Sequence, residues 1–372
     1  MGEASKILVT GARGFVGKNL TLRLKEQEPY SPIEFLRGDS LEKLADDVSK
    51  ADAVVHLAGV NRPNDEEEFT QVNGDLTVSL CKIIKDLGRP VPLLLASSAQ
   101  AVSDNPYGQS KRVAERAVQR LSEETGNPSV IYRLPGIFGK WCRPNYNSVV
   151  ATFCHNIARG IPINITDNNK KVRLVYVDDV IDEFIITLGC MKNGSFTREV
   201  NPEYMIRLGD LAARIQDFRN GRTSLCVERV GRGLARALYA TFLSYIPKEE
   251  FVYNLKCHDD ERGSFVEMLK TQDSGQFSYF TAYPGVTRGG HYHHTKTEKF
   301  LVIKGNARFG FCNVLTGEKY QISVCGDTPQ VVEPPPGWVH DITNIGDEEM
   351  VVLLWANEQF NCDRPDTVAN IV

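Results

Sequence analysis

The chain has 372 residues, a formal net charge of −4 and a pI near 6.0. This length suits two domains, and the absence of a basic tract argues against nucleic acid and anionic membranes as partners. No apolar run approaches the roughly 18 residues needed to span a bilayer, and no signal-peptide pattern opens the chain. Its nine cysteines include no C-x-x-C pair, which favours reduced thiols. We therefore expect a cytoplasmic protein.

The first part of the chain alternates short β-branched runs with amphipathic segments, which predicts an α/β Rossmann-type parallel sheet. Helices are expected at Gly17–Glu26 and Lys111–Thr125, and Arg207–Tyr245 is expected to be helical and to close this domain near Pro247. The predicted strands are Lys6–Thr10, Ile33–Arg37, Ala53–Leu57, Pro92–Ser97 and Ser129–Leu134.

The C-terminal part has short strands separated by Gly and Pro, which predicts an antiparallel all-β sandwich or barrel. The sequence therefore predicts two domains, 1–246 and 247–372. The strands expected in the second are Ser264–Leu269, Gln276–Ala282, Lys299–Lys304, Ala307–Asn313, Gln330–Glu333 and Met350–Ala356.

A glycine-rich turn follows the first predicted strand. Its G-x-x-G-x-x-G spacing allows a tight turn and a close approach of the backbone to a pyrophosphate at a helix N-terminus. Alone this is weak evidence, because glycine turns without a ligand are common. The expected cofactor contacts in the turn are Gly11, Arg13, Gly14, Phe15, Val16 and Gly17.

Three later features strengthen the prediction of a nucleotide site. Leu57-Ala58-Gly59 ends a strand where a ligand crevice should open, and Ser97-Ser98 ends the next strand. Tyr107 and Lys111 are four residues apart, so a helix would direct both side chains to the same site.

Residues 5–185 resemble the extended short-chain dehydrogenase/reductases that act on nucleotide-linked sugars. The resemblance implies that Tyr107 protonates a carbonyl oxygen as hydride arrives. It implies that Lys111 holds the nicotinamide ribose and lowers the pKa of the phenol. It also implies that Ser98 hydrogen-bonds the carbonyl, with Ser97 as a close alternative.

Two arginines favour NADPH over NADH. Arg37 comes directly after Ile33-Glu-Phe-Leu at the end of the second predicted strand, where the resembling enzymes often carry an Asp that binds the ribose 2′-OH, and Arg13 lies inside the glycine turn. Two guanidinium groups near one ribose favour a 2′-phosphate. Asp39 could reverse this preference, and two solvated surface arginines are the alternative interpretation.

The same resemblance implies contacts with the sugar nucleotide. Asn147 lies in a segment that contacts the substrate in such enzymes, and Arg173 lies where they often bind pyrophosphate. Pro135-Gly136 replaces an asparagine of the family in the segment after Arg133, which leaves that contact open.

A histidine cluster marks the second domain. His291 and His293 alternate on one predicted strand, Glu298 follows five residues later, and His340 follows a Pro-Pro-Gly turn. Three imidazoles and a carboxylate form an N/O ligand set for a divalent metal, with zinc as the first choice and nickel, manganese and iron as alternatives. The spacings G-x5-H-x-H-x4-E-x6-G and P-x-G-x2-H-x3-N resemble the cupins, which implies a double-stranded β-helix.

A second resemblance assigns His291 another role. The segments Asp260–Glu267 and Pro284–Tyr292 resemble the cupin 4-keto-sugar 3,5-epimerases, in which the residue matching His291 is the base. Residues matching Arg288 and Lys299 bind the substrate and its enolate there. A ligated imidazole has no free lone pair, so one residue cannot fill both roles, and the intact ligand set favours ligation. The candidates for the base are then Lys299, Tyr292 and His294.

The two predicted chemistries suit one 4-keto sugar, because the ketone acidifies C3–H and its reduction fixes the new stereocentre. The whole chain resembles the bifunctional capsule-polysaccharide enzymes that make precursors of UDP-N-acetyl-L-fucosamine, in the blocks His56–Pro63, Asp104–Gly108, Phe138–Ser148 and Tyr292–Val302.

This resemblance implies C3 epimerisation of UDP-2-acetamido-2,6-dideoxy-4-ketohexose in the cupin domain. NADPH-dependent C4 reduction in the first domain would then give UDP-2-acetamido-2,6-dideoxy-L-talose. We expect a homodimer. The alternatives are a reductase for a related dTDP-keto sugar, or a cupin domain that only dimerises the reductase.

Overall fold

The computed structural model describes residues 4–62, 65–363 and 365–372, which form two compact units. Unit 1 comprises Met1–Ile215 and Ala237–Ile246, and unit 2 comprises Gln216–Arg236 and Pro247–Val372. Pro63, which ends one of the resembling blocks, lies outside the described residues.

Unit 1 is built on a six-stranded parallel sheet in the order β2-β1-β3-β4-β5-β8, so the predicted α/β class is confirmed. β1 has β2 on one side and β3 on the other, so a ligand crevice is expected at the carboxyl ends of β1 and β3. The strands are β1 (Ser5–Thr10), β2 (Tyr30–Phe35), β3 (Ala53–His56), β4 (Leu93–Ser98), β5 (Ser129–Leu134) and β8 (Ser195–Arg198).

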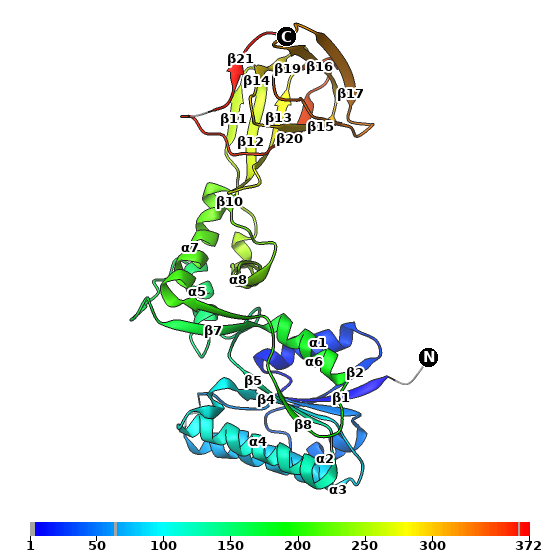
Figure 1. Cartoon of the computed structure of the whole chain (residues 1–372), viewed down its shortest axis with the longest axis vertical. Helices are drawn as coiled ribbons and strands as arrows, with labels where there is room; N and C mark the ends of the chain where they lie inside the picture. Colours follow the sequence, from blue (N-terminus) through cyan, green and yellow to red (C-terminus); the bar gives the residue numbers. More distant parts are fainter. Residues whose placement is uncertain (1–3, 63–64, 364) are drawn as a thin grey trace. The chain divides into compact units, whose positions relative to one another are not determined.

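Helices cover both faces of this sheet (Figure 1). α1 and α6 lie on one face, while α2, α3 and α4 lie on the other and enclose an apolar core that includes Leu8, Val54 and Leu80. The helices are α1 (Phe15–Glu26), α2 (Leu41–Lys50), α3 (Leu76–Asp86), α4 (Pro106–Thr125), α5 (Val149–Ala158) and α6 (Val177–Leu188).

Helix α4 begins five residues before the predicted helix start, which places Tyr107 in its first turn. The Asn105 side chain accepts a hydrogen bond from the Gly108 N–H at 2.7 Å, and Pro106 occupies the first turn, where its missing N–H costs nothing. The helix ends at Gly126, whose φ is 72°.

A small three-stranded sheet completes unit 1, together with a π-helical turn, η1 (Phe69–Asp75), and a 3-10 turn, η2 (Ala99–Val102). Its strands, in the order β6-β7-β9, are β6 (Gly136–Phe138), β7 (Lys171–Tyr176) and β9 (Glu203–Arg207).

The segment Arg207–Tyr245 is not one helical region. It contains α7 (Leu208–Ser224), β10 (Cys226–Val227) and α8 (Gly233–Leu243). The break comes at Leu225, whose φ of 60° is incompatible with a continuing α-helix. β10 then pairs in parallel with β12 (Gly263–Thr271), which brings residues 216–236 into unit 2.

Unit 2 is all-β apart from its share of these helices and the short η3 (Lys248–Glu250), as the sequence predicts. One sheet has the order β10-β12-β13-β20-β15-β18, with β11 paired to β12, and the other has the order β17-β16-β19-β14-β21. The further strands are β11 (Cys257–Asp260), β13 (Gln276–Ala282), β14 (Thr287–Tyr292), β15 (Glu298–Lys304), β16 (Asn306–Asn313), β17 (Lys319–Cys325), β18 (Val331–Val332), β19 (Trp338–Asn344), β20 (Met350–Ala356) and β21 (Val368–Ala369).

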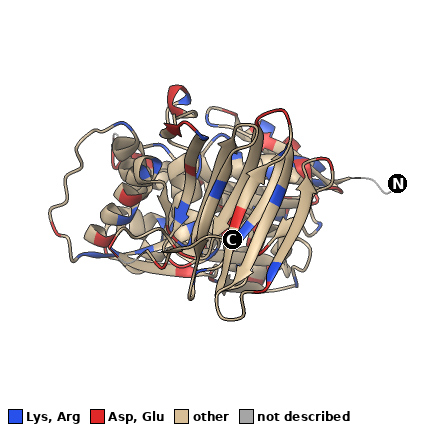
Figure 2. Cartoon of the chain, turned by 90° about the horizontal axis from the view of Figure 1, so that it is seen from above, with Lys and Arg blue, Asp and Glu red and all other residues tan. Residues whose placement is uncertain are grey.

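The inward residues of both sheets form the core of unit 2, which includes Phe280, Phe300, Phe309 and Val352. Figure 2 shows basic and acidic residues interspersed over the chain. No helix among the described residues has the length and apolar character needed to cross a membrane.

Candidate active sites

The glycine turn packs closely against the segment that follows β3. Gly11 has φ 68°, and a Cβ there would lie 2.9 Å from the Ala58 backbone nitrogen. A Cβ on Gly17 would lie 2.2 Å from the Gly11 carbonyl oxygen, so a side chain is excluded at both positions. Phe15 and Val16, both half-buried, begin α1, and the turn therefore lies at a helix N-terminus that can attract a phosphate.

A buried histidine holds this segment in place. Thr10 Oγ1 accepts hydrogen bonds from the backbone N–H groups of Leu57 and Ala58, both at 3.1 Å, so its own proton is directed to His56 Nδ1 at 2.7 Å. His56 Nε2 lies 2.9 Å from Thr77 Oγ1. Burial, followed by the charge of Lys111, lowers the pKa of His56 to about 3, so this imidazole is neutral at pH 7.

Tyr107, Lys111 and Ser98 come together at the ends of β4 and α4. Lys111 Nζ lies 5.9 Å from the centre of the Tyr107 ring and donates to the Ala96 carbonyl at 3.3 Å. Ser98 lies near enough to Tyr107 to lower the pKa of its phenol. A Cβ on Gly59 would lie 3.2 Å from Lys111 Nζ, so the strand-end segment borders the same site.

Burial shifts the pKa of both members of this pair. It raises the pKa of Tyr107, which Ser98 lowers only in part. Burial lowers the pKa of Lys111 to about 8, against the opposing charge of Glu115. At pH 7 the site therefore holds a protonated phenol beside a cation.

A buried carboxylate that the sequence did not reveal separates the two candidate serines. Ser97 Oγ donates to Glu115 Oε1 at 2.6 Å, and Arg133 binds both oxygens of the same carboxylate at 3.0 and 2.6 Å. The Ser97 hydroxyl is thus bound to a buried carboxylate, whereas Ser98 lies near Tyr107. The signal available in the sequence was the spacing of Glu115, four residues after Lys111 on the same helix.

The two predicted cofactor arginines are exposed. The Arg37 side chain is 85% exposed, and its Nη2 lies 3.3 Å from Glu68 Oε2. Arg13 is exposed in the glycine turn. Asp39 is engaged locally: its carboxylate accepts from the Leu36 N–H at 2.8 Å, a bond that lowers its pKa.

The predicted sugar-nucleotide residues lie on or beside other elements of unit 1. Arg173, on β7, binds both oxygens of Glu203 at 2.5 and 2.8 Å. A pyrophosphate would therefore compete with this carboxylate for the guanidinium. Asn147 is exposed just before α5.

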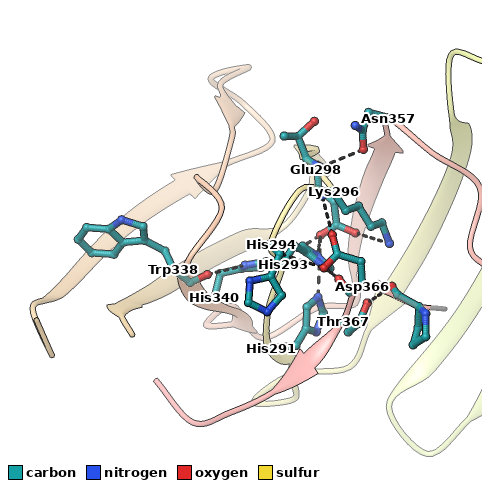
Figure 3. Close-up of polar contacts among 12 residues, drawn as sticks. His291, His293, His294, Lys296, Glu298, Trp338, His340, Asn357, Asp366 and Thr367 are labelled. Atoms are coloured by element: carbon teal, nitrogen blue, oxygen red, sulfur yellow. Dashed lines mark hydrogen bonds and ion pairs between the residues drawn. The ribbon is translucent and has the colours of Figure 1, made fainter. Parts of the chain in front are cut away.

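In unit 2, the four predicted metal ligands converge (Figure 3). Each offers one ligand atom, and these atoms all lie within 4.8 Å of one another. The Nε2 atoms of His293 and His340 are both 3.2 Å from Glu298 Oε2, and that of His291 is 3.9 Å away. The cluster forms because β14 and β19 are paired, with His291 opposite His340, while β15 begins at Glu298.

Backbone carbonyls orient two of these imidazoles. His293 Nδ1 lies 2.5 Å from the Asp366 carbonyl oxygen, and His340 Nδ1 lies 3.3 Å from the Trp338 carbonyl oxygen. Nδ1 carries the proton in each case, which leaves Nε2 free to bind a cation. Among the residues that the structure describes, His293 Nε2 is buried without a well-oriented hydrogen bond. The arrangement therefore fits a divalent metal.

Glu298 is a buried anion. Burial raises its pKa, but the side chains of the three histidines around it and the charge of Lys296 outweigh burial and hold the pKa well below the ordinary value. Lys296 Nζ lies 3.3 Å from Glu298 Oε1, and its side chain is only 9% exposed. Lys296 was not among the predicted site residues.

A cavity of about 160 Å³ lies beside this cluster. Arg288 is nearly buried at its wall, where its Nε donates to the Thr281 carbonyl at 2.9 Å. Its Nη2 forms an ion pair with Asp260 Oδ1 at 3.6 Å but has no hydrogen-bond partner among the described residues, so it can still donate to an anionic oxygen. The lining includes Phe265, Phe280, Arg288, His291, Glu298, Phe300 and His340.

The structure does not bring the predicted Lys299 to this site. Alternate residues of β15 face opposite sides of the sheet, so Glu298 is buried while Lys299 points outward and pairs with Glu333 at 2.9 Å. Of the other two candidates for the base, His294 is exposed and its ring lies 5.4 Å from that of Tyr292. None of these three side chains is among the residues that line the cavity.

Comparison with known proteins identifies the class. Residues 7–201 match the NAD dependent epimerase/dehydratase family, and residues 258–368 match the polysaccharide biosynthesis C-terminal domain. The chain belongs to the NAD dependent epimerase/dehydratase family. It is an enzyme of this reductase and epimerase class, with a nicotinamide cofactor and a C-terminal polysaccharide-synthesis domain.

Three relatives refine the comparison. The chain is 54% identical over 364 residues to a UDP-2-acetamido-2,6-beta-L-arabino-hexul-4-ose reductase of Pseudomonas aeruginosa, covering 98% of each. It matches the crystal structure of the capsular polysaccharide assembling protein CapF from Staphylococcus aureus with a TM-score of 0.90 and 41% identity, over 98% of this chain and 100% of that one. The spore coat polysaccharide biosynthesis protein SpsL of Bacillus subtilis is 26% identical over 31% of this chain and 83% of its own length. The predicted resemblance to capsule-polysaccharide enzymes is confirmed.

Proposed function

We propose that the chain is a bifunctional enzyme of nucleotide-sugar synthesis. Its all-β domain, a cupin, inverts C3 of UDP-2-acetamido-2,6-dideoxy-4-ketohexose, and its α/β domain reduces the C4 ketone to give UDP-2-acetamido-2,6-dideoxy-L-talose. The observation that carries the proposal is the 54% identity to a UDP-keto-sugar reductase over both domains of the chain. The two candidate sites described above support it independently.

In the α/β domain, NADPH when bound supplies the hydride that adds to C4. Tyr107 then donates its phenolic proton to the oxygen at C4, a role supported by its protonated state at pH 7. Ser98 hydrogen-bonds the same oxygen, and Lys111 holds the nicotinamide ribose and places its positive charge near the phenolate that remains.

In the all-β domain, a divalent metal, with zinc as our choice, would be held by His291, His293, Glu298 and His340, and would supply positive charge for the enolate oxygen. A base takes the C3 proton, which leaves the electron pair in this enolate, and a proton returned to the opposite face gives the epimer; none of the three candidates for that base lines the cavity. Arg288 supports the same step, because its Nη2 at the cavity wall makes no hydrogen bond to its ion-pair partner Asp260 and can donate to the enolate oxygen.

Deuterium exchange at C3 tests the proposal. In D2O without NADPH, the wild type should incorporate deuterium into the UDP-4-keto sugar, and the absence of exchange would exclude the epimerase. Tyr107→Phe should retain exchange and lose about 10²–10⁴-fold in reduction, since it removes the acid alone. Loss of both activities in this variant would argue against separate sites.

His291→Ala resolves the role of that histidine. The variant should lose exchange whether His291 binds the metal or the proton, but only the loss of a ligand weakens zinc binding. We expect weaker zinc binding.

A dTDP-linked keto sugar is the control substrate for the nucleotide. Equal use of it would contradict the assignment to a UDP sugar.

The preference for NADPH has its own test. Arg37 and Arg13 are exposed and available to a 2′-phosphate, and a charge-assisted contact of this kind contributes about 1.5–3 kcal/mol. Arg37→Ala should therefore raise KM for NADPH about 10- to 100-fold and leave KM for NADH unchanged. Equal use of both cofactors by the wild type would contradict the proposal. The homodimer and the cytoplasmic location stay predictions.

A further inference from the structure

The last residues of the chain return to the histidine cluster. After β20 ends at Ala356, β21 pairs with β14, with Ala369 opposite His291 and Val368 opposite Tyr292. Between these strands, Asp366 lies beside the loop that joins β14 to β15 (Figure 3). This tail belongs to neither histidine motif.

Asp366 binds the loop through its carboxylate. Oδ1 accepts from the His294 N–H at 3.0 Å, and Oδ2 accepts from the N–H groups of Thr295 and Lys296, both at 2.8 Å. Oδ2 also accepts from Thr295 Oγ1 at 2.9 Å. Three successive N–H groups aimed at one carboxylate form a concave anion site, which the side chain of Asp366 fills.

The carbonyl of the same residue accepts from His293 Nδ1. The carboxylate therefore holds the carbonyl in place, and the carbonyl fixes which nitrogen of His293 faces Glu298. We propose that Asp366 is the positioning residue of the metal site, acting on the cation through His293. This inference rests on the proposed metal site and assigns Asp366 no contact with the metal or substrate.

The conformation of Asp366 guides the choice of variants. Its φ of 37° is in the left-handed region, which Asn and Gly adopt more readily than Ala. Asp366→Asn replaces one acceptor oxygen by an amide that repels the loop N–H groups, and Asp366→Gly removes the side chain. Both variants keep the carbonyl of residue 366.

Zinc affinity of the full-length chain, measured by competition with a chromogenic chelator, tests the inference. Loss of a group that orients a metal-binding histidine typically costs 10- to 100-fold in affinity, so both variants should raise the zinc Kd by about this factor. Thr295→Val, which removes one of the four contacts, should raise it less. Asp363→Asn, in an exposed part of the same tail, should not change it.

The thermal midpoint of the metal-free proteins separates positioning from general stability. A purely structural role would lower the midpoint of the metal-free variants and leave the zinc Kd of the folded protein unchanged, which would overturn the inference. A wild type that does not bind zinc would instead overturn the proposed metal site. The two failures are thus distinct.

Discussion

The two sites bury opposite charges with different support. In unit 1, Lys111 is a buried cation with one carboxylate, Glu115, that raises its pKa. The opposite effect of burial is larger and lowers that pKa to about 8. In unit 2, Glu298 is a buried anion. There the three imidazoles and Lys296 together lower its pKa by more than burial raises it. Burial disfavours the charged form of both groups, so the difference in the direction of their stabilisation follows from the number of polar partners around each.

This difference matches the chemistry we propose for each site. A cation whose pKa is near neutral can change its charge within the working pH range, and it lies where a proton moves. A carboxylate that stays ionised presents a fixed negative charge, which suits the binding of a metal ion. The comparison can therefore be tested by removing a partner from each site.

The largest expected effect comes from Glu115→Gln in unit 1. This change breaks the paired contact of the buried Glu115 with Arg133, and because the Arg133 side chain is 38% exposed the cost is about 2–3 kcal/mol of unfolding free energy, less than for a fully buried pair. It also removes the charge that raises the pKa of Lys111, so this pKa should fall further below 8. The alkaline decline of kcat/KM for reduction should then move to lower pH, with a rate about three- to tenfold lower at pH 8.

The direction in which stability changes with pH follows from the shifted pKa of Lys111. The folded pKa of Lys111, about 8, is below its ordinary value of 10.5, so the cation is lost as pH rises through about 8. Between these two values the unfolded chain binds more protons, so this group makes the fold more stable as pH rises. Arg133→Met is the matched control, since it breaks the same ion pair but keeps the charge of Glu115. A shift to lower pH in both variants would contradict the role of that charge.

The fold was largely predictable from local patterns. The bounds of β5, β13 and β20 agree with the prediction, because each is a short run rich in β-branched, aromatic and other apolar residues between turn signals. The helix expected at Arg207–Tyr245 failed because β10 depends on pairing with β12, which no local pattern encodes. Tertiary contacts override helix propensity in such segments.

The same distinction applies to the sites. The spacing of His291, His293 and Glu298 identified a ligand set because these residues lie on neighbouring strand ends, and the structure brings them together with His340. Asp366 is 73 residues from His293 in sequence and has no motif of its own. Motif spacing therefore finds the candidate metal ligands, while a residue that orients one of them, such as Asp366, is found only from the path of the folded chain.

A smaller effect is expected from Lys296→Met in unit 2. Its Nζ is the partner of Glu298 Oε1, and the variant leaves that oxygen buried without this donor. An unsatisfied buried acceptor costs about 1–3 kcal/mol of unfolding free energy. The loss should appear in urea unfolding of the metal-free chain, followed by a probe in the all-β domain.

Lys299→Met, three residues further along the chain and on β15, is the matched control. Its pair with Glu333 is between side chains that are 46% and 51% exposed, and such exposed pairs contribute about 0.2–1 kcal/mol. Exchange at C3 should survive in this variant, because Lys299 points away from the cavity. If both changes lowered the free energy of unfolding equally, the buried carboxylate of Glu298 would not be stabilised by Lys296. Loss of exchange in Lys299→Met alone would restore the substrate-binding role that the resemblance assigned to Lys299, and with it a site that extends to the outer face of β15.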